Sequence, residues 1–120
     1  MTRILLVEDC VPTARMIRIF LARLRFDSDH ISSGEQAVDL VRREEYAAVL
    51  MDIQLDGLDG LEAARRIRAR ERRIGLPRLP ILGMSGQDAA TQAAACLAAG
   101  MDAYLAKPFP LDRLREVLDG

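Results

Sequence analysis

Residues 47–52, Ala47-Ala48-Val49-Leu50-Met51-Asp52, form an apolar run that ends on a carboxylate. Short continuous apolar runs of this kind are typical of β-strands that are covered on both faces. Four further short runs, at 4–7, 27–31, 79–84 and 103–105, alternate with stretches of helical period. The alternation predicts an α/β fold in which five parallel strands lie between two layers of helices.

The five helical stretches each carry an apolar stripe that is expected to face the sheet. In chain order, the stripes comprise Ala14, Ile17, Leu21 and Leu24; Ala37, Val38 and Val41; Leu61, Ala64 and Ile67; the alanines of 88–99; and Leu111, Leu114 and Leu118. Ser33 and Gln36 stand at capping-box spacing, and Gly100 stands where a helix should end. Six arginines of the third helix are expected to form a solvated face: Arg65, Arg66, Arg68, Arg70, Arg72 and Arg73.

Right-handed crossovers favour an open, doubly wound sheet with the flavodoxin-like strand order 2-1-3-4-5. The 120 residues fit a single domain, residues 1–120. In this topology the winding reverses between the first and third strands, and ligands bind there, beyond the carboxyl ends of the strands. The same edge of the sheet is therefore where functional side chains are expected.

The composition excludes several classes of function. A formal net charge of -1 gives no general attraction to nucleic acid or to a membrane surface, and no apolar run is long enough to span a bilayer. Cys10 and Cys96 provide neither a disulfide framework nor a metal-binding spacing, and His30 is the chain's one histidine. Lys107 is the one lysine beside sixteen arginines, which suggests a role that requires a compact ammonium group.

Polar side chains stand at the ends of four predicted strands. Glu8 and Asp9 follow the first strand, Asp52 the third, Ser85 the fourth and Lys107 the fifth. Three carboxylates in one crevice repel one another, and a hard divalent cation such as Mg2+ relieves that repulsion. Asp9 and Asp52 are expected to bind it directly and Glu8 through water, with a backbone carbonyl near Gln54 as a further ligand. Asp52 would then be a nucleophile toward phosphorus, with Lys107 and Ser85 facing the phosphoryl oxygens.

Five segments together resemble the receiver domains of two-component signalling, the chemotaxis response regulator family, over essentially the whole chain. They are 4–9 (ILLVED), 49–55 (VLMDIQL), 59–63 (DGLEA), 79–86 (LPILGMSG) and 99–109 (AGMDAYLAKPF). The resemblance implies that Asp52 is the phospho-acceptor, Glu8 and Asp9 the acidic pair, and Lys107 the phosphate partner. It also implies a cis bond before Pro108 and a magnesium cofactor that Mn2+ can replace.

The resemblance further implies a two-state switch. Before phosphorylation, the Ser85 hydroxyl and the Tyr104 ring would point away from the site, and phosphorylation would draw both inward. Gln54 and Gln87 would flank the attacking water and set the lifetime of the phosphoryl group. The face formed by the fourth helix, fifth strand and fifth helix would change shape for an output partner, with dimerisation on phosphorylation as one consequence.

The implied phosphoryl donor is a histidine kinase or a histidine phosphotransfer protein in the cytoplasm, without direct nucleic-acid contact. Catalysis would be limited to self-catalysed phosphoryl transfer and autodephosphorylation. Three positions depart from the usual pattern of the family: Asp56 replaces a loop proline, Ser85 a threonine and Gly86 an alanine. Asp56 is expected to loosen the loop and to add negative charge near the site.

Alternative functions remain at this stage. The chain can be a stand-alone regulator, or the receiver module of a hybrid histidine kinase that passes its phosphoryl group to a histidine phosphotransfer domain. A haloacid-dehalogenase-like phosphohydrolase uses similar groups, but its second aspartate would have to stand where this chain has Gln54. A flavodoxin-like cofactor binder would need a loop that attracts phosphate, and Glu8-Asp9 would repel it.

Overall fold

Five strands and five helices alternate in the computed structural model, which describes residues 2–86 and 89–119. In chain order they are β1 (Arg3–Val7), α1 (Val11–Arg23), β2 (Asp27–Ile31), α2 (Gly34–Arg43), β3 (Ala48–Asp52), α3 (Gly60–Ile74), β4 (Ile81–Ser85), α4 (Ala89–Ala98), β5 (Ala103–Ala106) and α5 (Leu111–Asp119). The predicted start of the fourth helix, Asp88, lies outside the described residues. The predicted start of the fourth strand was two residues early, because β4 begins at Ile81.

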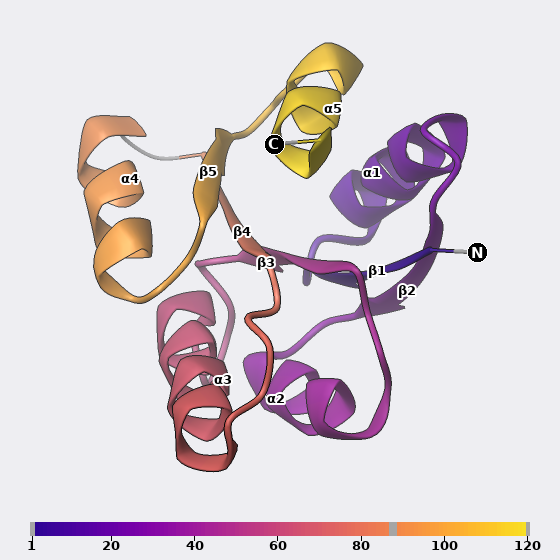
Figure 1. Ribbon diagram of the computed structural model, residues 1–120. Coiled ribbons are helices and arrows are strands. Elements are labelled where there is room, and N and C mark those ends of the chain that lie inside the picture. Colours follow the sequence, from indigo (N-terminus) through magenta and orange to yellow (C-terminus); the bar gives the residue numbers. More distant parts are fainter. Residues whose placement is uncertain (1, 87–88, 120) are drawn as a thin grey trace.

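The strands form one parallel sheet in the order β2-β1-β3-β4-β5, which confirms the predicted topology. Figure 1 shows α1 and α5 over one face of the sheet and α2 and α3 over the other. The residues of α4 pack with those of α2 and α3. None of the helices described in residues 2–86 and 89–119 is long and apolar enough to cross a membrane.

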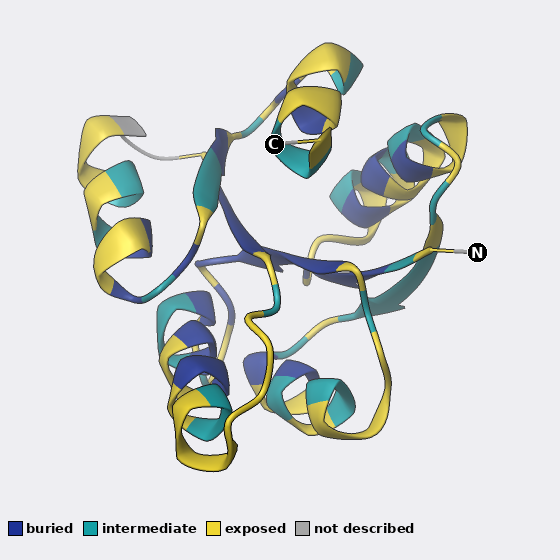
Figure 2. Ribbon diagram, viewed as in Figure 1, coloured by how far each residue is buried: buried dark blue, intermediate teal, exposed yellow. Residues whose placement is uncertain are grey.

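Alternate residues of each central strand enter the two halves of the core. Leu5 and Val7 of β1 pack with α2, α3 and α4, whereas Ile4 and Leu6 pack with α1 and α5. All five residues of β3 and of β4 are buried, and this explains why their sequences read as continuous apolar runs. Figure 2 shows the central strands as the most buried part of the molecule.

Local sequence signals account for several helix ends. The Ser33 hydroxyl accepts a hydrogen bond from the Gln36 amide at 3.1 Å, as the capping pattern predicts. The Gln36 side chain reaches back to the Ser32 amide at 3.4 Å rather than to that of Ser33. Asp59 caps α3 by accepting from the Glu62 amide at 2.8 Å, and Gly75 ends it with a φ of 69°.

One prediction about α3 is wrong, because its arginine face is not uniformly solvated. Arg68 is only 3% exposed. Its guanidinium donates to Glu71 Oε1 at 2.8 Å, to Asp102 Oδ2 at 2.8 Å and to the Gly100 carbonyl oxygen at 2.7 Å. The reason is position: Arg68 lies one turn after Ala64 on the buried stripe, and these acceptors offset the cost of burying its charge.

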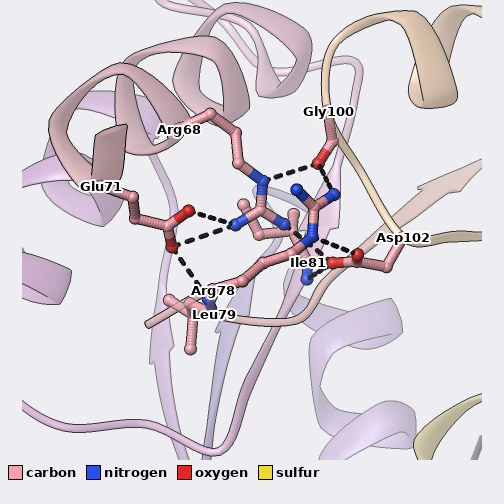
Figure 3. Close-up of polar contacts among 7 residues, drawn as sticks. All are labelled: Arg68, Glu71, Arg78, Leu79, Ile81, Gly100 and Asp102. Carbon is pink, nitrogen blue, oxygen red and sulfur yellow. Dashed lines mark hydrogen bonds and ion pairs between the residues drawn. The ribbon is translucent and has the colours of Figure 1, made fainter. Parts of the chain in front are cut away.

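Further bonds extend this arrangement into an ion network, formed by Arg68, Glu71, Arg78 and Asp102 (Figure 3). Arg78 Nε donates to Asp102 Oδ1 at 2.8 Å. The Leu79 amide donates to Glu71 Oε2 at 2.8 Å, and the Ile81 amide donates to Asp102 Oδ2 at 2.8 Å. The network therefore joins α3, the segment that leads into β4 and the α4–β5 connection at the amino edge of the sheet.

Candidate phosphorylation site

The opposite, carboxyl edge of the sheet gathers the predicted site residues. Asp52 is the last residue of β3 and Glu8 follows β1, and they are 4% and 0% exposed. The Lys107 ammonium, which follows β5, donates to Glu8 Oε1 at 2.7 Å and to Asp52 Oδ2 at 3.0 Å. One lysine thus bridges two buried carboxylates that come from different strands.

Backbone hydrogen bonds beyond the strand ends hold these residues in place. The Glu8 amide donates to the Ile31 carbonyl at 3.0 Å, and the Lys107 amide donates to the Ser85 carbonyl at 2.8 Å. These bonds continue the parallel ladders one residue past β1 and β5, so the backbones that carry Glu8 and Lys107 are fixed by the sheet. The Lys107–Pro108 peptide bond is cis.

The second oxygen of each buried carboxylate is also hydrogen-bonded. Asp52 Oδ1 accepts from the Gln54 amide at 2.9 Å, and Glu8 Oε2 accepts from the Cys10 amide at 3.2 Å. Each carboxylate therefore has one oxygen on the lysine and one on a backbone amide two residues further along. Such bonds favour the charged form of a carboxylate and fix its orientation.

The electrostatic balance of the site depends on burial. Burial raises the pKa of Glu8, and the hydrogen bond from Lys107 opposes that rise. Burial alone would lower the pKa of Lys107, but hydrogen bonds to Glu8 and Asp52 raise it overall above its ordinary value. Lys107 therefore remains an ammonium ion. Its single positive charge does not balance the three carboxylates of Glu8, Asp9 and Asp52.

The acidic cluster fits a divalent cation by its donor set. Glu8, Asp9 and Asp52 each offer a carboxylate oxygen, and these oxygens lie within 4.8 Å of one another. Three carboxylates and one ammonium give a formal charge of -2, which a hard cation with oxygen ligands balances. The Gln54 backbone is adjacent, since its amide contacts Asp52.

The predicted switch residues lie at the ends of neighbouring strands. Ser85 is the last residue of β4 and is fully buried. Tyr104, on β5, donates from its hydroxyl to the Ser85 carbonyl oxygen at 3.1 Å. Gln87 lies outside the described residues. The predicted movement of Ser85 and Tyr104 stays a prediction.

One contact at this site was not predicted. A ring nitrogen of His30 lies 2.7 Å from the Glu8 carbonyl oxygen, which can only accept, so that nitrogen carries a proton. The pairing of Leu6 with His30 in the β1–β2 register brings the ring there. Gly60 packs directly against the Asp52 backbone, where a Cβ would overlap the carbonyl oxygen. A glycine at this position lets the loop after Asp52 turn close to the site.

Comparison with known proteins agrees with this geometry. The family described as "Response regulator receiver domain" matches residues 4–119. The receiver domain of sensor histidine kinase PA1611 from Pseudomonas aeruginosa, solved with a magnesium ion in its active-site cleft, is 38% identical with a TM-score of 0.87. That match covers 98% of this chain and 94% of the other.

Other relatives are longer proteins or parts of complexes. The sensor protein GacS of Pseudomonas syringae is 32% identical over 97% of this chain, which spans 13% of GacS. The receiver domain of Ssk1 from Saccharomyces cerevisiae, crystallised with the histidine phosphotransfer protein Ypd1, is 26% identical with a TM-score of 0.90. That match covers 98% of this chain and 86% of the other. The family match over nearly the whole chain, together with the strand order and the acidic edge, shows that the chain belongs to the response regulator receiver domain family.

Proposed function

We propose that Asp52 accepts a phosphoryl group from a phosphohistidine of a partner protein. One carboxylate oxygen of Asp52 would bond to phosphorus as the phosphorus–nitrogen bond breaks, and the imidazole would leave with a proton in place of the phosphoryl group. The observation that carries this proposal is the Lys107 bridge, because it puts one cation against Asp52 Oδ2 at 3.0 Å inside a cluster of acids.

The side chains around Asp52 have separate tasks in this proposal. Lys107 would face the incoming phosphoryl oxygens, and the Ser85 hydroxyl would donate to one of them. Glu8, Asp9, Asp52 and the Gln54 carbonyl would hold Mg2+, which would supply positive charge for the phosphoryl oxygens. Mn2+ prefers similar oxygen ligands and should substitute.

Phosphorylation would then alter the face formed by α4, β5 and α5. Tyr104 is well placed for this, since its hydroxyl already contacts the backbone of Ser85. Gln54 and Gln87 would set the lifetime of the phosphoryl group by flanking the attacking water. An output partner, or a second copy of the chain, would bind the altered face.

The donor in this proposal is a histidine kinase or a histidine phosphotransfer protein. The Ssk1 relative, solved in complex with Ypd1, supports such a partner. Relatives such as GacS, of which this chain spans 13%, also support a second role as the receiver module of a hybrid histidine kinase. In that role Asp52 would pass its phosphoryl group on to a phosphotransfer histidine.

A labelling experiment tests the acceptor. The purified chain is incubated with acetyl phosphate and Mg2+, and the phosphoryl group is detected by intact mass spectrometry before and after mild treatment with hydroxylamine, which cleaves acyl phosphates. Wild-type protein should gain one labile phosphoryl group, and Asp52→Asn should gain none. Asp56→Asn, which changes an exposed acid in the same loop, is the matched control and should still be labelled. Labelling of Asp52→Asn equal to that of the wild type would refute the assignment.

A further inference from the structure

A groove of about 530 Å³ lies at the amino edge of the sheet, opposite the phosphorylation site. Its walls are the carboxyl-terminal halves of α2 and α3 and the segment 76–80 that leads into β4. Its apolar lining includes Val41, Ile67 and Leu79, which pack on the core. Leu76 also lines the groove, and 39% of its surface is exposed. The volume is within the range that proteins use to bind ligands.

Unpaired positive charge surrounds this apolar floor. Arg42, Arg70 and Arg73 line the groove, and none of their guanidinium groups makes an ion pair or hydrogen bond with any residue in 2–86 or 89–119. Most of the other charged residues of the lining are already paired: Arg66 with Glu62, Arg78 with Asp102, Glu44 with Arg3 and Glu71 with Arg68. Among the described lining residues this leaves three unpaired arginines against one unpaired acid, Glu45, in a chain whose net charge is -1.

The ion network at the amino edge preforms one wall of the groove (Figure 3). Glu71 Oε2 holds the Leu79 amide at 2.8 Å, and Asp102 Oδ1 holds Arg78 Nε at 2.8 Å. Both bonds fix the segment 76–80 against α3 before any partner arrives. A wall that is already ordered adds little conformational cost on binding.

We infer that this groove docks an acidic, amphipathic segment of a partner protein. An apolar side chain of that segment would contact Val41, Ile67 and Leu79, while its carboxylates would pair with the three unpaired arginines. Arg70 and Arg73 stand three residues apart on α3 and so project from one face, which matches acids spaced by one helical turn. A nucleic-acid backbone would satisfy the arginines but would leave the apolar floor uncovered.

The position of the groove separates this function from the proposed phosphorylation. Helices of a parallel sheet run opposite to its strands, so the ends of α2 and α3 lie at the edge that is farthest from Asp52. A partner docked there leaves Asp52 and Lys107 accessible to a phosphoryl donor. The inference therefore goes beyond the proposed function and stands without it.

The probe for this site is a short, fluorescein-labelled helical peptide of glutamate and leucine in amphipathic order. Binding to the full chain is followed by fluorescence polarisation, and its location by amide shifts in NMR spectra. We expect saturable binding, with shifts that cluster on 41–42, 67–73 and 76–79. The double variant Arg70→Glu/Arg73→Glu should weaken binding about tenfold or more. Val41→Thr should also weaken binding, because it removes apolar contact with the peptide and leaves the arginines unchanged.

The matched control is Arg15→Glu/Arg23→Glu, which makes the same change in charge at two exposed arginines of α1. It should bind the probe like the wild type, and amide spectra of every variant verify that the fold is retained. A peptide with lysine in place of glutamate should not bind. The inference is overturned if the acidic probe does not bind, if its shifts map to another face, if the two double variants weaken binding equally, or if duplex DNA displaces the probe.

Discussion

Replacing the buried arginine of the ion network should cost this domain much of its stability. Arg68→Ala removes the bonds from the guanidinium to Glu71, Asp102 and the Gly100 carbonyl. The Glu71 carboxylate, whose side chain is 11% exposed, then keeps the Leu79 amide as its only donor among residues 2–86 and 89–119. Asp102 is 31% exposed and keeps Arg78 and the Ile81 amide. The Glu71 carboxylate therefore carries most of the uncompensated charge.

The magnitude follows from this difference between the two acids. Removing one partner of a buried ion pair costs roughly 3–5 kcal/mol, because the remaining charge is left in a poorly solvated place. Since Asp102 remains compensated, we expect a loss at the lower end, about 3 kcal/mol. Replacing both charges, as in Arg68→Met/Glu71→Gln, should cost less than Arg68→Ala alone, because no uncompensated carboxylate remains.

Urea denaturation followed by circular dichroism measures this loss. For a slope of about 1–3 kcal/mol per molar urea, a loss of about 3 kcal/mol lowers the midpoint by roughly 1–3 M. Arg72→Ala is the control, because Arg72 is exposed on the same helix and should change the free energy of unfolding by no more than about 0.5 kcal/mol. The reasoning is refuted if Arg68→Ala costs less than about 1 kcal/mol, or if the double replacement costs more than the single one.

Three further predictions concern the proposed phosphorylation site. Lys107→Met should lower the free energy of unfolding in metal-free buffer by about 3 kcal/mol, because Glu8 and Asp52 lose their shared cation; an unchanged urea midpoint would contradict this. Burial raises the pKa of Glu8, so the folded state holds that proton more tightly than the unfolded state does. Stability in metal-free buffer should therefore fall as the pH rises from the ordinary glutamate pKa through the raised value, and thermal melts of Glu8→Gln should lack that component. Gly60→Ala should lower the free energy of unfolding by roughly 1–3 kcal/mol and reduce labelling by acetyl phosphate. The reason is that the added Cβ would overlap the Asp52 carbonyl oxygen and lie 2.8 Å from Ile53 Cα. Gly86→Ala is the control and should change neither stability nor labelling, because the nearest atom to its Cβ lies 3.9 Å away.

The strand order and the location of the site were predictable because both follow from short-range patterns. Buried apolar runs mark the strands, and parallel strands bring their carboxyl ends to one edge, so Glu8, Asp52 and Lys107 had to be neighbours. The hydrogen bonds by which Lys107 bridges Glu8 and Asp52 could not be predicted. Which oxygen of each carboxylate meets the lysine depends on the hydrogen bonds that fix the other oxygens, at Gln54 and Cys10.

The burial of Arg68 shows where sequence reasoning failed. Seven residues after Leu61 and four after Ala64, it continues the apolar stripe of α3, so the helical period did contain a signal. A basic residue on such a stripe is usually exposed unless buried hydrogen-bond acceptors pair with its charge. Its acceptor Asp102 lies 34 residues away in the chain, and only the packing of α4 against the sheet brings that carboxylate into reach.

The structure also shows a link between Lys107 and Tyr104, through the Ser85 carbonyl, that the sequence did not reveal. The Ser85 carbonyl oxygen accepts two hydrogen bonds, from the Lys107 amide at 2.8 Å and from the Tyr104 hydroxyl at 3.1 Å. Phosphorylation would replace the single negative charge of the Asp52 carboxylate, which Lys107 now contacts, with about -1.5 to -2 charges on the phosphoryl group. Movement of Ser85 toward that charge would displace its carbonyl oxygen, and the Tyr104 bond is the weaker of the two because it is longer and comes from a side chain that can rotate. We therefore predict that phosphorylation weakens the hydrogen bond from Tyr104 to Ser85.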